Sequence, residues 1–289
     1  MTTAVAAPFR FFSLQVVRTR RLGPSLVRVT FAGDDLEHFH SHGRDQSLSL
    51  FIPAEGRTEP TVPIELGWGS PRSSEAESGG GWWQAWRELP DDVRAVMRSY
   101  TLRALRRNPD EIDIDFALHG VEPGAACAAG PASRWASRAG AGDRVILLGP
   151  ALADNRAIRF RPPQDADLVL IWGDQTAVPA ATAILESLPA TTRVRAWLEV
   201  PRAGDIQDVA TLADAEIEWV VGDTATEAVR GARLPSAARP YVWIAGESGR
   251  VKELRRHFVG ERGVDRRRVT FVGYWRQGLT EEQLRVAGG

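Results

Sequence analysis

The 289-residue sequence contains one cysteine, one lysine and no uninterrupted apolar run of membrane-spanning length. Cys127, the single cysteine, has no second thiol within the chain, so no intrachain disulfide is expected to stabilise the fold. The first eight residues lack the basic stretch and apolar core that characterise a signal peptide. We therefore expect a cytoplasmic protein with no membrane span.

An excess of charge of one sign is also missing. The 36 lysine and arginine residues balance 37 acidic residues, which gives a formal net charge of −1. A general affinity for nucleic acid is therefore not expected. Lys252 is the only lysine, and we attribute the preference for arginine to GC-rich codons.

The first half of the chain has the apolar pattern of β-strands. Ile112, Ile114 and Phe116 alternate with Asp113 and Asp115, which predicts a strand with one face in the core and one in water. Together with turn-like connections, the pattern predicts a six-stranded antiparallel Greek-key barrel within residues 1–150. The six predicted strands are 11–17, 26–31, 48–52, 100–105, 112–118 and 144–148.

An insertion at residues 53–98 interrupts this pattern. Its first part is rich in glycine and serine and low in complexity. Its second part, residues 82–90, contains three tryptophans and predicts a short helix. The tryptophans could line a ligand pocket, but the area that each would bury favours packing against the barrel.

The second half, residues 163–289, alternates buried strands with helices. This alternation predicts a Rossmann-like α/β domain with a parallel sheet. The predicted strands are 167–172, 194–200, 216–221, 241–245 and 269–274. The predicted helices are 176–188, 224–230, 248–261 and one that begins near Thr280 with a capping-box pattern.

One predicted strand carries a cation, an aromatic ring and a hydroxyl in close succession. Arg98 and Tyr100 would share one face of the strand, while Thr101 points to the other. The arginine could pair with a phosphate, the tyrosine could stack on a planar ring, and the threonine could hydrogen-bond a ring nitrogen. This order predicts a flavin-binding strand, although an ordinary amphipathic edge strand would have the same pattern.

A second candidate element follows the strand that ends before His119. In the sequence Gly130-Pro131-Ala132-Ser133, the proline is typical of the first turn of a helix. The N–H groups at the start of such a helix suit a pyrophosphate.

Six short segments of the sequence combine glycines, aromatic rings and polar side chains. They are Arg98-Ser99-Tyr100-Thr101-Leu102-Arg103, Asp115-Phe116-Ala117-Leu118-His119-Gly120, Gly130-Pro131-Ala132-Ser133-Arg134-Trp135-Ala136, Gly173-Asp174-Gln175-Thr176-Ala177-Val178-Pro179-Ala180, Trp243-Ile244-Ala245-Gly246-Glu247 and Gly273-Tyr274-Trp275-Arg276-Gln277-Gly278. Their order is that of siderophore-interacting proteins, a family of flavin-dependent ferric-siderophore reductases in the ferredoxin reductase superfamily. The chain resembles this family over nearly its whole length.

The resemblance implies FAD as the cofactor and assigns residues to it. The implied cofactor-binding residues are Arg98, Tyr100, Thr101, His119, Gly130, Ala132, Ser133, Trp135, Asp174, Thr176, Tyr274 and Trp275. A ferric siderophore is often anionic, so a basic rim would attract it. The candidates for this rim are Arg134, Lys252, Arg255 and Arg256, although the last three could equally form a solvated helix face. Ser49 stands where the family's lysine is expected, which is a departure from the family pattern.

The electron donor is left open by the sequence. Glu199 ends a predicted strand, where an acidic residue suits a ribose 2′-hydroxyl, whereas Arg202 in the next loop suits a 2′-phosphate. NADH and NADPH are therefore both compatible with the sequence. The Gly-x-Gly-x-x-Gly fingerprint of dinucleotide-binding domains is absent.

The resemblance thus implies an NAD(P)H-dependent ferric-siderophore reductase, and we expect no metal site and no catalytic acid or base. Two alternatives stay open at this point. One is a reductase that exchanges electrons with a ferredoxin or an oxygenase, and the other is a flavin-containing siderophore-binding protein without nicotinamide activity.

Overall fold

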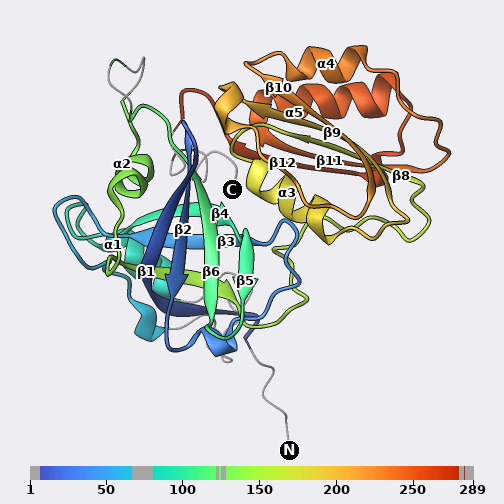
Figure 1. The fold of residues 1–289 in the computed structure, drawn as a ribbon. Helices are drawn as coiled ribbons and strands as arrows, with labels where there is room; N and C mark the ends of the chain where they lie inside the picture. Colours follow the sequence, from blue (N-terminus) through green and yellow to red (C-terminus); the bar gives the residue numbers. More distant parts are fainter. Residues whose placement is uncertain (1–6, 67–80, 122–123, 125–127, 280–282, 284–289) are drawn as a thin grey trace, which may run out of the picture. The chain divides into compact units, whose positions relative to one another are not determined.

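The structure, a computed structural model, describes residues 7–66, 81–121, 124, 128–279 and 283. By its internal contacts the chain divides into two compact units (Figure 1). Unit 1 comprises residues 1–21 and 26–158, and unit 2 comprises residues 22–25 and 159–289. Cys127, most of the glycine-serine segment and most of the predicted C-terminal helix lie outside the described residues.

Unit 1 contains a curled antiparallel sheet in the order β4-β3-β7-β1-β2-β6-β5. Its strands are β1 Phe9–Gly23, β2 Leu26–Ala32, β3 Ser47–Ile52, β4 Val96–Thr101, β5 Ala104–Arg106, β6 Glu111–Ala117 and β7 Arg144–Pro150. Its helices are α1 Trp82–Glu88 and α2 Pro131–Arg138, with short 3-10 helices at Leu36–His38 and Ile64–Leu66. The predicted fold class of this half of the chain, an antiparallel β-barrel, is thereby confirmed.

The sheet has seven strands rather than the predicted six, because the segment 100–105 is divided. β4 ends at Thr101, and β5 begins at Ala104 at the opposite end of the sheet order. At the break, the Leu102 N–H donates to the Gln46 carbonyl at 2.9 Å, while the Arg103 N–H donates to the Asp113 carbonyl at 2.9 Å. Two consecutive residues thus bond to opposite ends of the curled sheet, and this change of partner ends one strand and begins the next.

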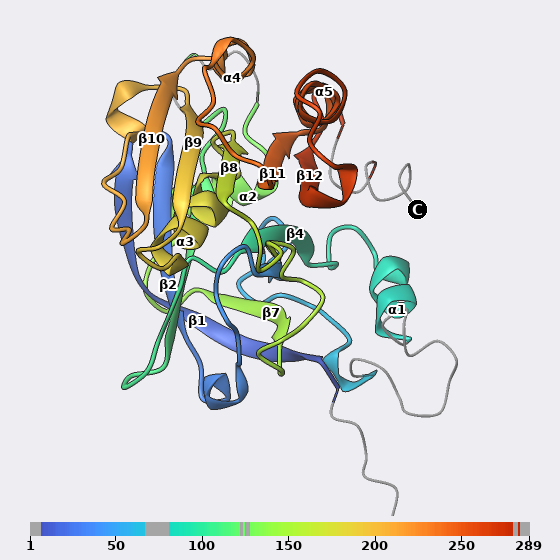
Figure 2. The same ribbon diagram turned by 90° about the vertical axis from the view of Figure 1, so that its right-hand side faces the viewer.

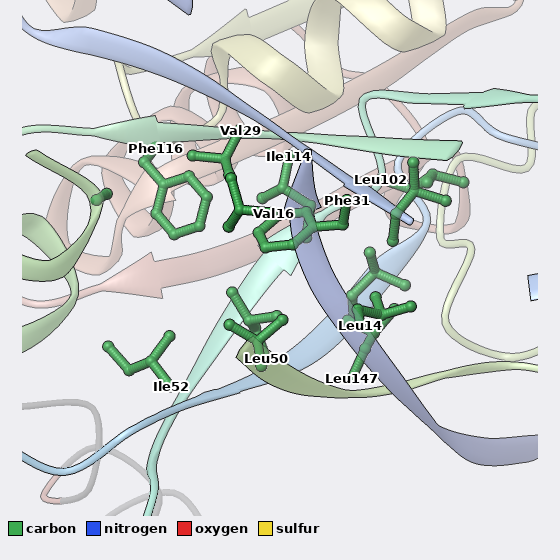
Figure 3. Packing of buried hydrophobic residues seen from close by; sticks show 14 of the residues in the cluster. Leu14, Val16, Val29, Phe31, Leu50, Ile52, Leu102, Ile114, Phe116 and Leu147 are labelled. Carbon is green, nitrogen blue, oxygen red and sulfur yellow. The ribbon is translucent and has the colours of Figure 1, made fainter. Parts of the chain in front are cut away.

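The interior of unit 1 is filled by apolar side chains from every long strand. Figure 3 shows Leu14, Val29, Leu50, Ile114 and Leu147 pointing toward one another between the strands. Each of them is 2% exposed or less. This apolar packing is the principal driving force for the fold of unit 1.

The carboxylates of β6 are buried, so the prediction that one face of this strand lies in water is wrong. Glu111, Asp113 and Asp115 are between 4% and 8% exposed. The reason is that arginines from β1, β2 and β5 cover them. The Arg18 guanidinium pairs with Glu111, that of Arg106 with Asp113 and that of Arg28 with Asp115, and we call this row the β6 ion-pair ladder.

The tryptophans of α1 pack against the sheet. Trp82 and Trp86 are 3% and 5% exposed, and both rings contact Phe51 of β3. The Trp86 indole N–H donates to the Ala95 carbonyl at 3.1 Å. The packing interpretation of this helix therefore holds for these two rings.

Unit 2 contains a five-stranded parallel sheet in the order β10-β9-β8-β11-β12, as Figure 2 shows. Its strands are β8 Leu168–Gly173, β9 Arg193–Val200, β10 Asp214–Val221, β11 Pro240–Glu247 and β12 Val269–Trp275. Its helices are α3 Val178–Ser187, α4 Ala225–Gly231 and α5 Ser248–Arg256, with a π-helical turn at His257–Glu261 and 3-10 turns at Ala203–Asp205 and Arg266–Arg268.

Helices cover both faces of this sheet. α3 packs on one face, whereas α4 and α5 pack on the other (Figure 1). The central strand β8 is buried along its whole length, as expected for a strand covered on both sides. The α/β part of the predicted fold class is confirmed. In the part of the chain that is described, no helix combines the length and apolarity needed to cross a membrane.

The β6 ion-pair ladder predicts a large loss of stability when one carboxylate is removed. Asp115 receives the Arg28 Nε and Nη2 groups at 2.6 and 2.8 Å, and both side chains are at least 85% buried. Asp115→Ala should lower the free energy of unfolding by about 3–5 kcal/mol, because the Arg28 charge stays buried without this carboxylate. Urea unfolding measures the change.

The matched control is Asp92→Ala, which breaks the exposed pair between Arg57 and Asp92. This variant should lose no more than about 1 kcal/mol. Equal losses in the two variants would contradict the role of the ladder.

Acid should destabilise unit 1 through the same ladder. The Arg18 hydrogen bonds hold the pKa of Glu111 below its ordinary value, although burial opposes them. Burial alone would raise the pKa of Asp113, but hydrogen bonds from Arg106 and Thr30 lower it below the ordinary value. A carboxyl whose pKa is lower in the folded state stabilises the protein above its unfolded pKa, and this contribution is lost as the pH falls through the folded pKa.

The free energy of unfolding should therefore fall as the pH decreases from about 5 toward the lowered folded-state values. The Glu111→Gln variant should show a shallower fall over the same range. A pH series of urea unfolding curves measures both, and parallel curves for the two proteins would disprove the assignment.

Candidate functional site

The predicted flavin-binding strand is β4. Arg98 and Tyr100 are both half-buried on one face, and Thr101 is 7% exposed on the other. The Arg98 guanidinium donates to the Met97 carbonyl at 2.7 Å, which directs the long side chain along the strand. A guanidinium and a phenol ring therefore lie side by side on the same face of an edge strand.

Tyr100 belongs to a group of aromatic rings. Its ring centroid lies 4.3 Å from that of Phe116 on β6, and the ring of Trp135 on α2 lies 5.7 Å from the Phe116 ring. The Trp135 ring also stacks parallel to Phe31 at 6.3 Å. Phe31 and Phe116 are fully buried, while Tyr100 and Trp135 are half-buried. The buried rings thus support two partly exposed aromatic side chains from β4 and α2.

The predicted anion-binding turn is the start of α2. Pro131 occupies the first turn of the helix, and Gly130 precedes it in an extended conformation. Among the described residues no side chain caps this helix. The exposed position of Gly130 leaves the approach to the first-turn N–H groups open.

The Ser133 hydroxyl fixes the start of α2 to the end of β6. Its Oγ donates to the Ala117 carbonyl at 3.2 Å and accepts from the His119 N–H at 3.3 Å. His119 itself is exposed, and Ala132, in the first turn of α2, is buried. Unit 1 therefore presents a partly positive helix start, an aromatic pair and a guanidinium, which together can hold an anion that carries a planar ring.

In unit 2, Asp174 and Thr176 lie directly after β8, at the carboxyl edge of the parallel sheet. Asp174 is 4% exposed, and its Oδ1 accepts from the Thr176 N–H at 2.9 Å and the Thr176 hydroxyl at 2.6 Å. Its Oδ2 accepts from the Glu247 N–H at 2.7 Å. Ligands of open α/β sheets bind at this edge.

The two predicted C-terminal aromatics differ in position. Tyr274 is half-buried and packs against the α3 side of the sheet. Trp275 is 40% exposed, yet its indole N–H donates to the Asp174 Oδ2 at 2.8 Å. Trp275 is thus the more exposed residue of this pair.

Glu199, the candidate ribose-binding residue, is already engaged within unit 2. It is 7% exposed at the end of β9 and pairs with the Arg250 guanidinium. It also accepts from the Ala225 N–H at 3.3 Å. Burial raises the pKa of the Glu199 carboxyl, while the Arg250 hydrogen bond acts in the opposite direction. Arg202 is exposed in the following loop.

The predicted basic rim is distributed over the two units. On α5, Lys252 and Arg256 are exposed, whereas Arg255 is half-buried with its guanidinium 4.6 Å from the Phe271 ring centroid. Arg255 is thus partly used in packing. In unit 1, Arg134 bonds the Ala129 carbonyl and the Glu55 carboxylate.

The sequence did not predict one carboxylate role and one supporting ring. Glu247 caps α5, since its Oε2 accepts from the Gly249 and Arg250 N–H groups at 2.6 and 2.9 Å. Its place before Ser-Gly at a strand-to-helix junction was the available signal. Phe116 supports the half-buried rings of Tyr100 and Trp135. The only sequence signal for this residue was its alternation with aspartates.

Comparison with known proteins matches both units. The family model "Siderophore-interacting FAD-binding domain" matches residues 15–154, and "Siderophore-interacting protein" matches residues 166–278.

Among curated relatives, the ferric vibriobactin reductase ViuB of Vibrio cholerae is 28% identical over 93% of this chain and 90% of its own length. The NADPH-dependent ferric-chelate reductase of Escherichia coli is 30% identical over 92% of this chain and 93% of its own.

Among solved structures, the siderophore-interacting protein SipS of Aeromonas hydrophila superposes with a TM-score of 0.73 and 31% identity. The alignment covers 98% of this chain and 97% of that one. The family models and the relatives agree over both units. The chain therefore belongs to the siderophore-interacting protein family.

Proposed function

We propose that the protein is an FAD-dependent reductase that transfers electrons from NADPH or NADH to ferric siderophores and releases Fe(II). The observation that carries the proposal is the start of α2, which no described side chain caps and which Ser133 fixes to the end of β6. This element lies in the part of the chain that the FAD-binding family model matches. The names of the Vibrio and Escherichia relatives support the iron substrate.

The donor set of unit 1 fits FAD. The first-turn N–H groups of α2, at Ala132 and Ser133, would receive the pyrophosphate, and Gly130 would allow its close approach. Arg98 would pair with a phosphate oxygen, while Tyr100 would contact the flavin ring.

Three more residues complete this proposed cofactor site. Thr101, buried on the opposite face of β4, would bond the flavin ring. His119, whose N–H bonds the Ser133 hydroxyl, would lie on the adenosine or phosphate side, and Trp135 of α2 would help to hold the pyrophosphate.

The proposed reaction balances two electrons against two iron atoms. One NADPH or NADH loses a hydride, which carries two electrons, and two Fe(III) ions become Fe(II). Bound FAD supplies the chemistry that accepts electrons in pairs and delivers them singly. The protein orients the donor and acceptor, and no side chain has to act as an acid or a base.

The carboxyl edge of the unit 2 sheet is the proposed site for the donor. Thr176 lies there after β8, and the exposed Trp275 lies there at the end of β12. The name of the Escherichia relative favours NADPH, whereas the Glu199–Arg250 pair is compatible with either nicotinamide. Lys252 and Arg256 on α5, with Arg134, would attract an anionic siderophore.

An anaerobic spectrum tests the proposed function. Purified protein reconstituted with FAD should have the yellow flavin spectrum and should bleach on addition of NADPH or NADH. A ferric siderophore added next should restore the colour, and a ferrous chelator should trap about two Fe(II) per nicotinamide oxidised. Protein that cannot bind FAD would refute the proposal, and so would flavin that neither nicotinamide reduces. A reduced flavin that only a ferredoxin reoxidises would favour the ferredoxin-linked alternative.

Arg98→Ala should weaken FAD binding by roughly ten- to a hundredfold, because a charge-assisted hydrogen bond to a phosphate is worth about 1.5–3 kcal/mol. Titration of the apoprotein with FAD, followed by quenching of flavin fluorescence, measures this change. Arg144→Ala is the control, since it removes an exposed guanidinium from β7 that pairs with Glu59. An unchanged dissociation constant in Arg98→Ala would remove this residue from the cofactor site.

A further inference from the structure

Trp275 is held at two points although its ring is exposed. Its carbonyl oxygen accepts from the Ser248 hydroxyl at 2.8 Å, and its indole N–H donates to the Asp174 carboxylate at 2.8 Å. Gly273 makes the first contact possible, because a Cβ at this position would lie 2.5 Å from the Ser248 Oγ. The side chain at the end of an edge strand is therefore fixed in direction.

The acceptor of the indole bond is itself rigid. Among the described residues, four donors reach the Asp174 carboxylate: the Thr176 N–H, the Thr176 hydroxyl, the Glu247 N–H and the Trp275 indole. A carboxylate that is 4% exposed and bonded on both oxygens has one low-energy orientation. Its oxygens are thus engaged in bonds within unit 2.

Gly246 brings the end of β11 against this carboxylate. Its φ of +144° is a backbone conformation that side chains disfavour, and a Cβ there would lie 2.5 Å from the Asp174 Oδ2. The close approach lets the Glu247 N–H reach the same oxygen that receives the Trp275 indole. The ends of β8, β11 and β12 are thereby joined at one carboxylate.

We propose that Asp174 is a positioning residue that acts through Trp275, and that it fixes the indole plane against which the nicotinamide ring of the donor packs. The inference rests on the proposed function, and it assigns Asp174 a role other than direct contact with a cofactor. Planar ligands pack on aromatic faces, and ligands of parallel sheets bind at the carboxyl edge where this ring is exposed. A hydrogen bond to a buried carboxylate restricts rotation of the ring, so the donor meets a preformed surface.

The hydrogen bond can be tested without cofactor or activity. In ¹H–¹⁵N spectra of the labelled protein, the Trp275 indole signal is the one that disappears in Trp275→Phe. In Asp174→Asn this signal should shift and its proton should exchange faster with solvent, because the charged acceptor is lost. The indole signal of Trp86, which donates to the Ala95 carbonyl in unit 1, serves as the internal control and should not move. An unmoved Trp275 signal in Asp174→Asn would overturn the proposal.

The positioning role can be tested by anaerobic stopped-flow reduction of the bound flavin. Asp174→Asn and Trp275→Phe should each lower the limiting rate roughly tenfold with little change in the donor dissociation constant, because an aromatic face is kept while its orientation is no longer fixed. The double variant should lose no more than either single variant, since both break one interaction. Trp86→Phe, which removes a buried indole bond far from this edge in the sequence, should keep the wild-type rate.

Additive losses of about a hundredfold in the double variant would show that Asp174 acts independently of Trp275 and would overturn the proposal. Unchanged rates in both single variants would do the same. A wild-type flavin that neither nicotinamide reduces is a different result, since it refutes the proposed function while the indole signals still report the bond.

Discussion

The need of buried carboxylates for hydrogen-bond donors organises both units of this protein. Removing a carboxylate from water costs several kcal/mol unless donors replace the lost solvation. In unit 1 arginines from β1, β2 and β5 meet this need for the carboxylates of β6. In unit 2 backbone amides, a hydroxyl and an indole meet it for Asp174. The same requirement therefore fixes strands to one another in one unit and strand ends in the other.

The sequence predicted the fold class well because the signals for it are local. The period of apolar residues distinguishes the strands of unit 1 from the alternating strands and helices of unit 2, and Pro131 marks a helix start. The division of the segment 100–105 was missed because it depends on partners at Gln46 and Asp113, which lie far away in the sequence. The buried state of Asp113 and Asp115 was missed for the same reason, since alternation alone cannot distinguish water from an arginine on the next strand.

The candidate site shows the same limit. Motif order brought Asp174 and Trp275 to attention, and the sequence offered both as direct cofactor contacts. Nothing in the spacing of two residues 101 positions apart indicates that one bonds the other. Gly246 was visible only as part of a short motif, and its function as the point where a backbone must approach a carboxylate requires the fold. Local patterns thus locate the chemistry, while long-range contacts decide how each residue takes part in it.

The exposed place of Lys252 on α5 has a practical consequence. Because it is the single lysine among 289 residues, it is the one side chain in the whole sequence that ends in a primary amine. Amine-directed reagents thus have one reactive side chain, which lies on helix α5 of unit 2. A dye, a spin label or a surface tether can be installed there with no engineered cysteine, and arginine at every other basic position keeps the rest of the side chains inert to the same reagent.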